Sequence, residues 1–352
     1  RRPGFDAALA DTAREAGADL RERTAVTGLI WRGGRVTGVR FEGRDGTSGV
    51  LRAPLVIGAD GRRSLVAREV GADTPHRRSK NRRACYFAYI EDERTGDDRH
   101  VAAQWREGRE LGTAFPCDDG LLLVLLMPPL DRSGEFKTDM EGEYRRTIAA
   151  IPGLAERVGG GRIATKVRSA TDTTAYFRHS AGHGWALAGD AGHFKDPVTA
   201  QGMRDAMRFG RLLGEAAAPV LEDVVALDRA VAAWQHRRDG ECLETYQWTN
   251  VLARAEAITP LEHELYRDVA ASPERTRELL DVFSRLRRPA EVLTAGRALR
   301  YTARAFCRPG VDRREVIRTT SRDARTTVRD AAERQFPRGI VSRRSPAGTA
   351  RA

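Results

Sequence analysis

The spacing of apolar residues changes several times along the chain, and each change predicts a different kind of element. Residues 5–16 have helical spacing with Gly17 just past the last apolar position, which predicts a helix with a glycine stop. Alternating apolar and polar residues follow, and they predict a short β-meander that ends in a buried strand at 55–59. The amino-terminal part is therefore expected to be mixed helix and strand.

Strand patterns separated by turns then dominate from about residue 83 to Pro129, which predicts an antiparallel sheet. The segment 138–154 predicts an amphipathic helix closed by Pro152-Gly153, followed by further strand pattern and a buried strand at Trp185–Ala188. After residue 200 nearly every segment is helical, including 273–287. The predicted divisions are 1–82 and 177–217 for one α/β domain, 83–176 for the sheet domain, and 218–352 for a helical carboxyl-terminal region.

The helix that begins near Gln201 has apolar residues three, four and seven positions apart. This spacing predicts that one face of the helix is buried. The residues expected on that face are Met203, Ala206, Met207, Gly210 and Leu213.

An aspartate directly follows an apolar strand at two places, Asp60 and Asp190, one on each side of the predicted sheet domain. A carboxylate at the end of a buried strand is costly unless a partner satisfies it. A bound ligand would be such a partner, so these two positions are candidates for one binding site.

Composition narrows the class of protein without naming its function. The chain has 41% hydrophobic and 31% charged residues, as in ordinary globular proteins, and no apolar run long enough to span a membrane. The net charge is +11, but the basic residues are nearly all arginines interleaved with acids, which indicates codon bias more than a nucleic-acid surface. Local excesses at 76–83 and 338–352 are interpreted as a solvated linker and a disordered tail.

Cysteine and histidine spacing gives little indication of a metal or a disulfide. The four cysteines are far apart, which predicts free thiols in a reduced, cytoplasmic protein. His179 and His183 have metal-like spacing, with Asp190 and His193 nearby, but they lie in a glycine-containing loop. No metal site is predicted.

Two motifs carry a family resemblance. "VIGADGRRSLVARE" resembles the Asp-Gly motif, and "WALAGDAGHFKDPVTAQGMRDAMRFGRLL" the Gly-Asp motif, of the class A FAD-dependent aromatic hydroxylases, which are similar to p-hydroxybenzoate hydroxylase. The resemblance covers roughly residues 1–215. It implies an α/β (α+β) fold with a Rossmann-like FAD-binding domain, an antiparallel substrate-binding sheet and a helical carboxyl-terminal region.

Within the Gly-Asp motif, the resemblance implies that Asp190 binds a ribityl hydroxyl of FAD and that Gly189 allows close approach of the backbone. Pro197 would begin the turn in front of the flavin ring. Gln201 and Gly202 would open a helix whose positive end faces that ring.

The remaining implied FAD contacts lie upstream. Asp60 and Gly61 would lie near the pyrophosphate, and Arg68 would pair with a phosphate. Arg2 matches an arginine that contacts FAD, against the alternative of a solvated terminal side chain. Val26 matches a position whose backbone meets the adenine, against the alternative of simple strand burial.

The family's strand-GxGxxG-helix unit, which binds the ADP part of FAD, is missing from the sequence, so a truncated FAD-binding domain is expected. The implied reaction uses NAD(P)H and O2 to oxygenate a small, aromatic organic molecule, and no catalytic side chain is assigned. A related reductase or halogenase and a non-catalytic fragment remain alternatives, and a homodimer is a further expectation.

Other side chains near these motifs are weaker candidates. His193 is interpreted either as a flavin contact or as a structural hydrogen-bonding group, and Lys195 as an exposed turn lysine. Substrate contacts are expected from polar and aromatic residues of the sheet domain, taken together: Tyr86, Tyr89, Gln104, Trp105 and Phe115.

Overall fold

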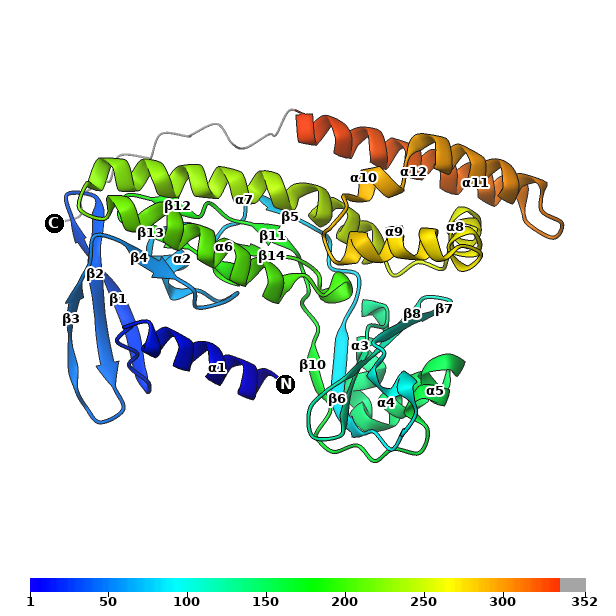
Figure 1. Cartoon of the computed structure of the whole chain (residues 1–352), viewed down its shortest axis with the longest axis horizontal. Helices are drawn as coiled ribbons and strands as arrows, with labels where there is room; N and C mark the ends of the chain where they lie inside the picture. Colours follow the sequence, from blue (N-terminus) through cyan, green and yellow to red (C-terminus); the bar gives the residue numbers. More distant parts are fainter. Residues whose placement is uncertain (336–352) are drawn as a thin grey trace.

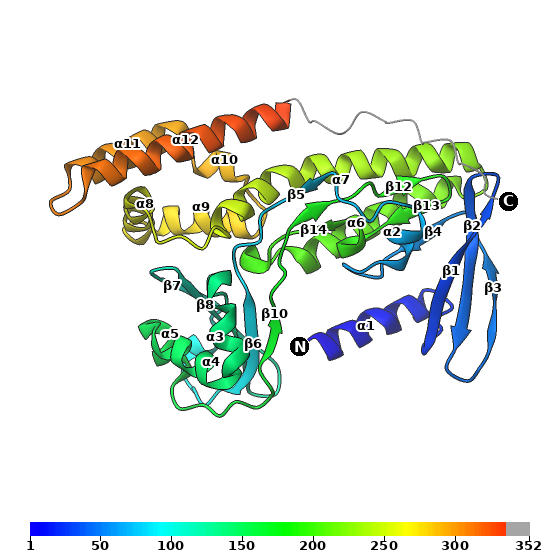
Figure 2. The ribbon, with the colours of Figure 1, turned by 180° about the vertical axis from the view of Figure 1, so that it is seen from behind.

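The computed structural model describes residues 1–335, and the tail predicted at 338–352 lies outside the described residues. The described chain forms a mixed α/β fold with an antiparallel sheet and a helical carboxyl-terminal region, as predicted. Figures 1 and 2 show a layer of long helices over the small sheets, with the five-stranded sheet module and helix α1 both on the other side of it.

The amino-terminal part is a helix followed by an antiparallel meander. The predicted first helix is confirmed as α1 (Arg2–Glu15), although none of its residues is buried. Gly38 allows two strands of the meander to approach closely, because a Cβ there would lie 2.1 Å from the Leu51 carbonyl oxygen. The three strands are β1 (Thr24–Arg32), β2 (Arg35–Gly43) and β3 (Ser48–Arg52).

A small sheet in the order β12-β13-β4 brings together two segments far apart in sequence. Strand β4 (Val56–Gly58) is parallel to β13 (Trp185–Leu187), with Gly58 opposite Leu187. β12 (Ala181–Gly182) pairs with the other edge of β13, and the short helix α2 (Leu65–Glu69) follows β4.

The segment 76–83, expected as a solvated linker, is instead part of the folded structure. Arg77 begins β5 (Arg77–Arg78) and forms an ion pair of 2.8 Å with Glu333. Arg83 is fully buried and donates hydrogen bonds to the carbonyl oxygens of Arg109 and Met127. The prediction was wrong because backbone pairing and buried carbonyl acceptors hold these cations.

Strand β5 belongs to a third sheet, in which the central strand β11 (Tyr176–Phe177) pairs with β5 on one side and with β14 (His193–Phe194) on the other.

The predicted antiparallel sheet is confirmed, with the order β10-β6-β9-β8-β7. One face packs on three helices, α3 (Ser133–Thr138), α4 (Met140–Ala149) and α5 (Pro152–Val158). The helix predicted to close at Pro152-Gly153 is confirmed as α4, and Pro152 begins the separate helix α5. The strands are β6 (Cys85–Glu91), β7 (Ala103–Glu107), β8 (Glu110–Pro116), β9 (Leu121–Leu126) and β10 (Arg168–Ala170).

Helix α6 (Gly202–Ala217) packs on the long helix α7 (Val224–Leu252), but of the residues predicted on its buried face only Leu213 is buried. Met203 and Met207 are 52% and 48% exposed, whereas Phe209 is 2% exposed. The buried face of α6 also includes a charged residue, which the apolar spacing could not indicate. The buried residues of α6 are Asp205, Phe209, Leu212, Leu213 and Ala217.

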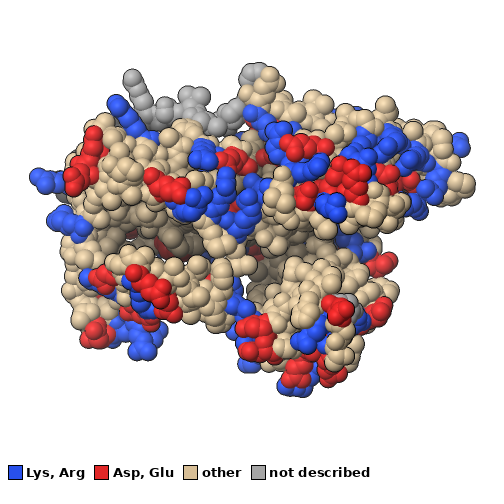
Figure 3. All heavy atoms as spheres, viewed as in Figure 1, with Lys and Arg blue, Asp and Glu red and all other residues tan. Residues whose placement is uncertain are grey.

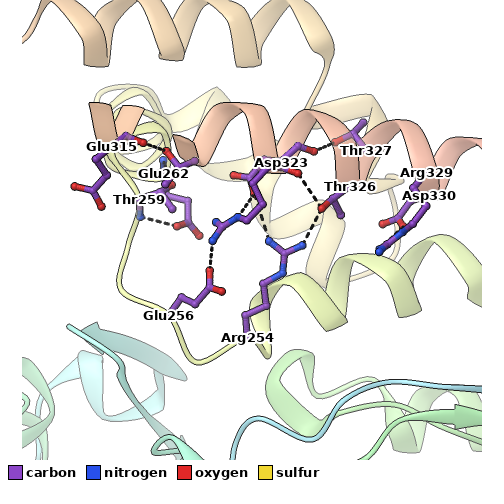
Figure 4. Close-up of polar contacts among 12 residues, drawn as sticks. Arg254, Glu256, Thr259, Glu262, Glu315, Asp323, Thr326, Thr327, Arg329 and Asp330 are labelled. Atoms are coloured by element: carbon purple, nitrogen blue, oxygen red, sulfur yellow. Dashed lines mark hydrogen bonds and ion pairs between the residues drawn. The ribbon is translucent and has the colours of Figure 1, made fainter. Parts of the chain in front are cut away.

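The carboxyl-terminal helices pack on the end of α7 mainly through polar side chains. Figure 4 shows Arg254 bonded to Asp323 and Thr326. The carboxylate of Glu256 forms an ion pair of 2.6 Å with Arg322. The helices are α8 (Pro260–Ala270), α9 (Pro273–Phe283), α10 (Pro289–Val292), α11 (Ala295–Cys307) and α12 (Arg313–Gln335).

Charges of both signs are interspersed over the face of the molecule seen in Figure 3, and many arginines form ion pairs with neighbouring acids. Within residues 1–335, none of the helices combines the length and the apolar character that crossing a membrane requires. The predicted domain boundaries stay predictions.

The corrected orientation of α6 predicts unequal effects of truncating two of its large side chains. Phe209→Ala should lower the free energy of unfolding by about 3–5 kcal/mol because it leaves a core cavity. Met207→Ala, the matched control on the exposed face, should change it by less than about 0.5 kcal/mol. Urea denaturation measures both; equal losses would contradict the observed packing.

Candidate functional site

The two strand-ending aspartates belong to adjacent parallel strands. Asp60 follows β4 and Asp190 follows β13, and the Ala188 N–H donates to the Gly58 carbonyl oxygen at 2.9 Å just before both turns. The carboxyl ends of parallel strands form the usual crevice for ligands in α/β folds. Both acids therefore lie at one edge of the same sheet, as their positions after apolar strands suggested.

A buried arginine holds the turns that follow these strands. Arg178 Nη2 donates to the carbonyl oxygen of Arg62 at 3.1 Å, and its Nη1 donates to that of Ala191 at 2.9 Å. Its Nε donates to the Asp73 carbonyl oxygen at 3.0 Å. Because each of these carbonyls lies in a different segment, one guanidinium fixes the spacing between the two turns.

The Asp190 carboxylate has no hydrogen bond or ion pair with any residue in the range 1–335. It is only partly exposed, and burial raises its pKa, while the charges of Arg62, Lys195 and Arg2 act in the opposite direction. Its backbone is nevertheless held firmly, since the Tyr176 hydroxyl donates to the Asp190 carbonyl oxygen at 2.6 Å. A positioned, half-buried and unpartnered acid is a candidate for contact with a ligand.

The turn after Asp190 leads to an uncapped helix terminus. Gly189 has φ +55°, a conformation that suits glycine. Asp196 accepts from the Val198 N–H at 3.0 Å, and burial raises the pKa of this carboxyl to about 6. Pro197 begins the short turn Pro197–Thr199 that follows.

Helix α6 then begins at Gly202 without a side-chain cap, because Gln201 donates to the carbonyl oxygens of Thr199 and Phe283 instead. A Cβ at Gly202 would meet no atom within 4 Å. Unsatisfied N–H groups at a helix start, together with the positive end of the helix dipole, attract negative charge.

The upstream residues of the predicted site occupy different places. The Asp60 carboxylate accepts from the backbone N–H groups of Leu65 and Val66 and so caps α2, beside Gly61 at φ +76°. Arg68 is exposed and donates to the Arg63 carbonyl oxygen at 2.7 Å. These contacts leave Arg68 pointing along its own turn.

Arg2 and Val26 lie on the amino-terminal elements. Arg2 forms an ion pair of 2.9 Å with Asp6 on α1, which raises its pKa, with a smaller contribution from the charge of Asp190. Val26 is 43% exposed on β1, so simple strand burial does not explain it. The charge of Arg2 thus interacts with that of Asp190.

His193 and Lys195 lie beneath the turn and not at an exposed edge. The expectation of an exposed lysine was wrong: Lys195 is 5% exposed and pairs with the buried carboxylate of Asp205. Burial lowers the pKa of Lys195 to about 8. His193 Nδ1 donates to the Tyr176 carbonyl oxygen at 2.9 Å, which is the structural role considered for it.

Ligand atoms of His193, Asp205 and Cys242 lie within 4.8 Å of one another, a grouping the sequence did not suggest. The Lys195 ammonium contacts the Asp205 carboxylate and lies 3.3 Å from His193 Nε2, so a positive charge already lies beside this group. The ring centroid of His179 lies 4.7 Å from that of His76, with the rings tilted by 36°. His183 Nδ1 lies 2.8 Å from an Asp228 carboxylate oxygen.

The five sheet residues considered for substrate contacts divide between two faces. Tyr86 and Trp105 pack against the helices α3 to α5. Tyr89 and Phe115 alternate with residues of that core and therefore face the opposite side. Gln104 also lies on that side, because it donates to the Val198 carbonyl oxygen at 3.4 Å. Figure 3 shows the surface hollowed between the lobe of this sheet and the lobe that carries α1.

Sequence reasoning missed Arg178, Tyr176 and Arg62. Arg62 stacks 4.3 Å over the Phe194 ring and forms an ion pair of 3.2 Å with Asp172. The available signal for Arg178 was a cation placed directly after the apolar pair Tyr176-Phe177, where a solvated side chain is unexpected.

Comparison with known proteins places these features in a family. The family model described as "FAD binding domain" matches residues 3–239. A digeranylgeranylglycerophospholipid reductase of Methanocella arvoryzae is 29% identical over 217 residues, 60% of this chain and 52% of that protein. The chain spans about half the length of the curated relatives it matches first.

Solved structures share the fold at low identity. The flavin-dependent brominase Bmp2 has a TM-score of 0.69 with 18% identity, covering 87% of this chain and 75% of its own. The anhydrotetracycline hydroxylase OxyS from Streptomyces rimosus has a TM-score of 0.55 with 21% identity, covering 79% and 55% respectively. These likenesses establish the fold.

The clamp formed by Arg178 predicts a large loss of stability on substitution. Arg178→Met should lower the free energy of unfolding by about 3 kcal/mol, because it leaves three carbonyl oxygens without their donor. Arg178→Lys should also lose about 2 kcal/mol, because one ammonium cannot reach all three. Arg145→Met, an exposed control, should cost less than about 0.5 kcal/mol in the same denaturation assay. A loss for Arg178→Met as small as that of the control would rule out the clamp.

The raised pKa of Asp190 predicts a pH-dependent gain on neutralisation. Because the folded pKa lies above the ordinary value of 3.8, ionisation of this carboxyl destabilises the fold, fully so at pH 7. Asp190→Asn should therefore raise the free energy of unfolding of the ligand-free chain at pH 7, by up to about 1 kcal/mol, and by less near pH 4. Asp131→Asn, an exposed control, should show no such gain. A destabilised Asp190→Asn protein at pH 7 would contradict this account.

Proposed function

The chain belongs to the FAD-binding domain family, and from this membership we propose that it is the main part of an FAD-dependent oxidoreductase that uses NAD(P)H and O2 to oxygenate a small aromatic molecule. The observation that carries the proposal is the unpartnered Asp190 carboxylate beside the uncapped start of α6. Such an acid suits a ribityl hydroxyl, and such a helix end suits the negative charge of a reduced flavin.

The residues present fit FAD in a definite way. Asp190 would accept hydrogen bonds from the ribityl chain, and Gly189 would let the backbone approach it. Pro197, Gln201 and Gly202 would form the turn and helix start beside the ring. When bound, FAD would accept a hydride from NAD(P)H and then activate O2 for transfer of one oxygen atom to the substrate.

Further cofactor contacts are proposed at Asp60, Gly61, Arg68, Arg2 and Val26. The clamp of Arg178 would keep the turns of Asp60 and Asp190 at the spacing that one extended ligand needs. The positive charge of Arg2 near Asp190 suits a cofactor that carries phosphates.

The substrate would lie between this crevice and the five-stranded sheet. Tyr89, Phe115 and Leu123 belong to the face of that sheet opposite its helices, and all are partly exposed. An apolar surface of this kind would exclude water from the reacting atoms and favour an aromatic substrate.

We also propose that a strand-GxGxxG-helix unit completes the FAD site next to β4. Among the described residues β4 is the edge of its sheet, and Ile57 in its centre is 45% exposed. Parallel strands are normally covered on both faces. Helix α1, with no buried residue, would gain a packing partner from the same unit.

Other chemistries on the same fold are the reductases and halogenases named among the relatives, and a non-catalytic fragment is the third alternative. Reduction of a double bond would leave a product without new oxygen, and halogenation would require halide. Product analysis therefore separates these reactions, whereas absence of flavin and turnover would favour the fragment.

Flavin binding tests the proposal directly. The chain, produced together with the residues encoded immediately upstream of Arg1, should bind FAD, and Asp190→Asn should weaken binding at least about tenfold because an acceptor of ribityl hydrogen bonds is lost. Asp131→Asn is the control. Quenching of flavin fluorescence measures affinity, and 18O2 labelling identifies the product. Wild-type affinity in Asp190→Asn, or no FAD binding, would overturn the proposal.

A further inference from the structure

A cavity of about 600 Å³ lies between α6, α7 and the turn that joins α9 to α10. Its size is in the usual range for small-molecule sites. Seven arginines line it against three acidic residues, and they come from four different parts of the chain. None of these residues belongs to the crevice at Asp60 and Asp190.

The acidic residues of the cavity are already engaged. Asp239 accepts from Arg238 at 2.9 and 2.6 Å, and Glu241 accepts from Arg208 at 3.1 and 2.8 Å. Glu244 accepts from a backbone N–H of α10 at 2.9 Å. Seven guanidinium groups thus share three carboxylates in the lining of the cavity, so positive charge is in excess there.

Arg204 and Arg285 are left with incomplete partners. Arg204 Nη1 lies 3.2 Å from one oxygen of Asp205, whose other oxygen already contacts the ammonium of Lys195. Arg285 Nη2 donates at 3.0 Å to the neutral backbone carbonyl of Glu241, and its buried Nη1 has no hydrogen-bond partner within residues 1–335. The Asp205 carboxylate thus serves two cations, Lys195 and Arg204, while Arg285 has no carboxylate partner among residues 1–335.

The backbone conformation of Arg285 and the charges around Arg204 also favour an anion site. Arg285 has φ +60°, in the left-handed region that favours glycine, and this conformation turns the chain back toward α7 after α9. Burial lowers the pKa of Arg204, and the nearby charges of Arg285 and Arg208 lower it further. Like charges gathered at one edge of a cavity favour binding of an anion there.

We propose that this cavity binds the phosphate group of a small molecule, held by Arg204 and Arg285. Guanidinium groups match phosphate oxygens with paired, charge-assisted hydrogen bonds, and the free Nη1 of Arg285 would supply one of them. The site is separate from the proposed flavin crevice and requires no flavin chemistry.

Calorimetric titration with inorganic pyrophosphate tests the proposal. The wild-type chain should bind pyrophosphate saturably, and the double variant Arg204→Gln/Arg285→Gln should bind it at least about tenfold more weakly, because two charge-assisted contacts are lost. Arg204→Lys should give an intermediate affinity because it keeps the charge without the fork. The single variant Arg285→Gln serves if the double variant does not fold.

The matched control is Arg145→Gln/Arg211→Gln, which removes the same charge from two exposed helical ion pairs. It should change the affinity less than twofold. NADP+ and NAD+ are titrated as two further probes. Binding of NADP+ that is tighter than that of NAD+ and depends on Arg204 and Arg285 would assign the phosphate to a dinucleotide. Binding of pyrophosphate alone would assign it to another phosphorylated molecule.

The proposal fails if none of pyrophosphate, NADP+ and NAD+ binds saturably. It also fails if the control variant weakens binding as much as the Arg204 and Arg285 variants do. Flavin fluorescence measured in parallel keeps this test distinct from that of the FAD site. Loss of pyrophosphate binding with unchanged flavin binding is the expected result for the double variant.

Discussion

Three backbone carbonyls from three separate segments converge on the guanidinium of Arg178, and the shape of the crevice depends on that buried cation. Hydrogen bonds from a charged donor are stronger than neutral ones, and water does not compete for them in this position. Because Arg178 fixes the backbone of both turns, the Asp190 carboxylate keeps its position without a hydrogen-bond partner of its own among residues 1–335. In the proposed function, a ligand that donates hydrogen bonds to this acid would offset the energetic disadvantage of its burial.

The positions of Asp60 and Asp190 could be predicted because strand, turn and acid are adjacent in the sequence, and the pairing of β4 with β13 then brought them together. The buried face of α6 could not. The face that is buried contains Asp205, which is tolerated because Lys195 and Arg204 form ion pairs with it. That compensation depends on tertiary structure and leaves no periodic signal.

Arginine was the residue type whose roles were hardest to foresee. The same side chain occurs as a fully buried donor at Arg83, as a clamp at Arg178 and as part of exposed ion pairs such as that of Arg145. Composition averages over these environments, so an interleaved charge pattern rightly argued against one large basic surface yet gave no indication of the cluster around Arg204 and Arg285. Only the packing of α6, α7 and α9 reveals it.

The open side of β4 has a consequence for how the chain behaves as an isolated molecule. Among residues 1–335, β4 is an edge strand with an exposed central isoleucine, and it presents unpaired backbone groups and apolar surface together. Such an edge accepts any strand of suitable register, including one from a second copy, and is a starting point for aggregation. A segment that covers this edge would therefore lower the tendency of the protein to aggregate, in addition to forming part of the proposed binding site.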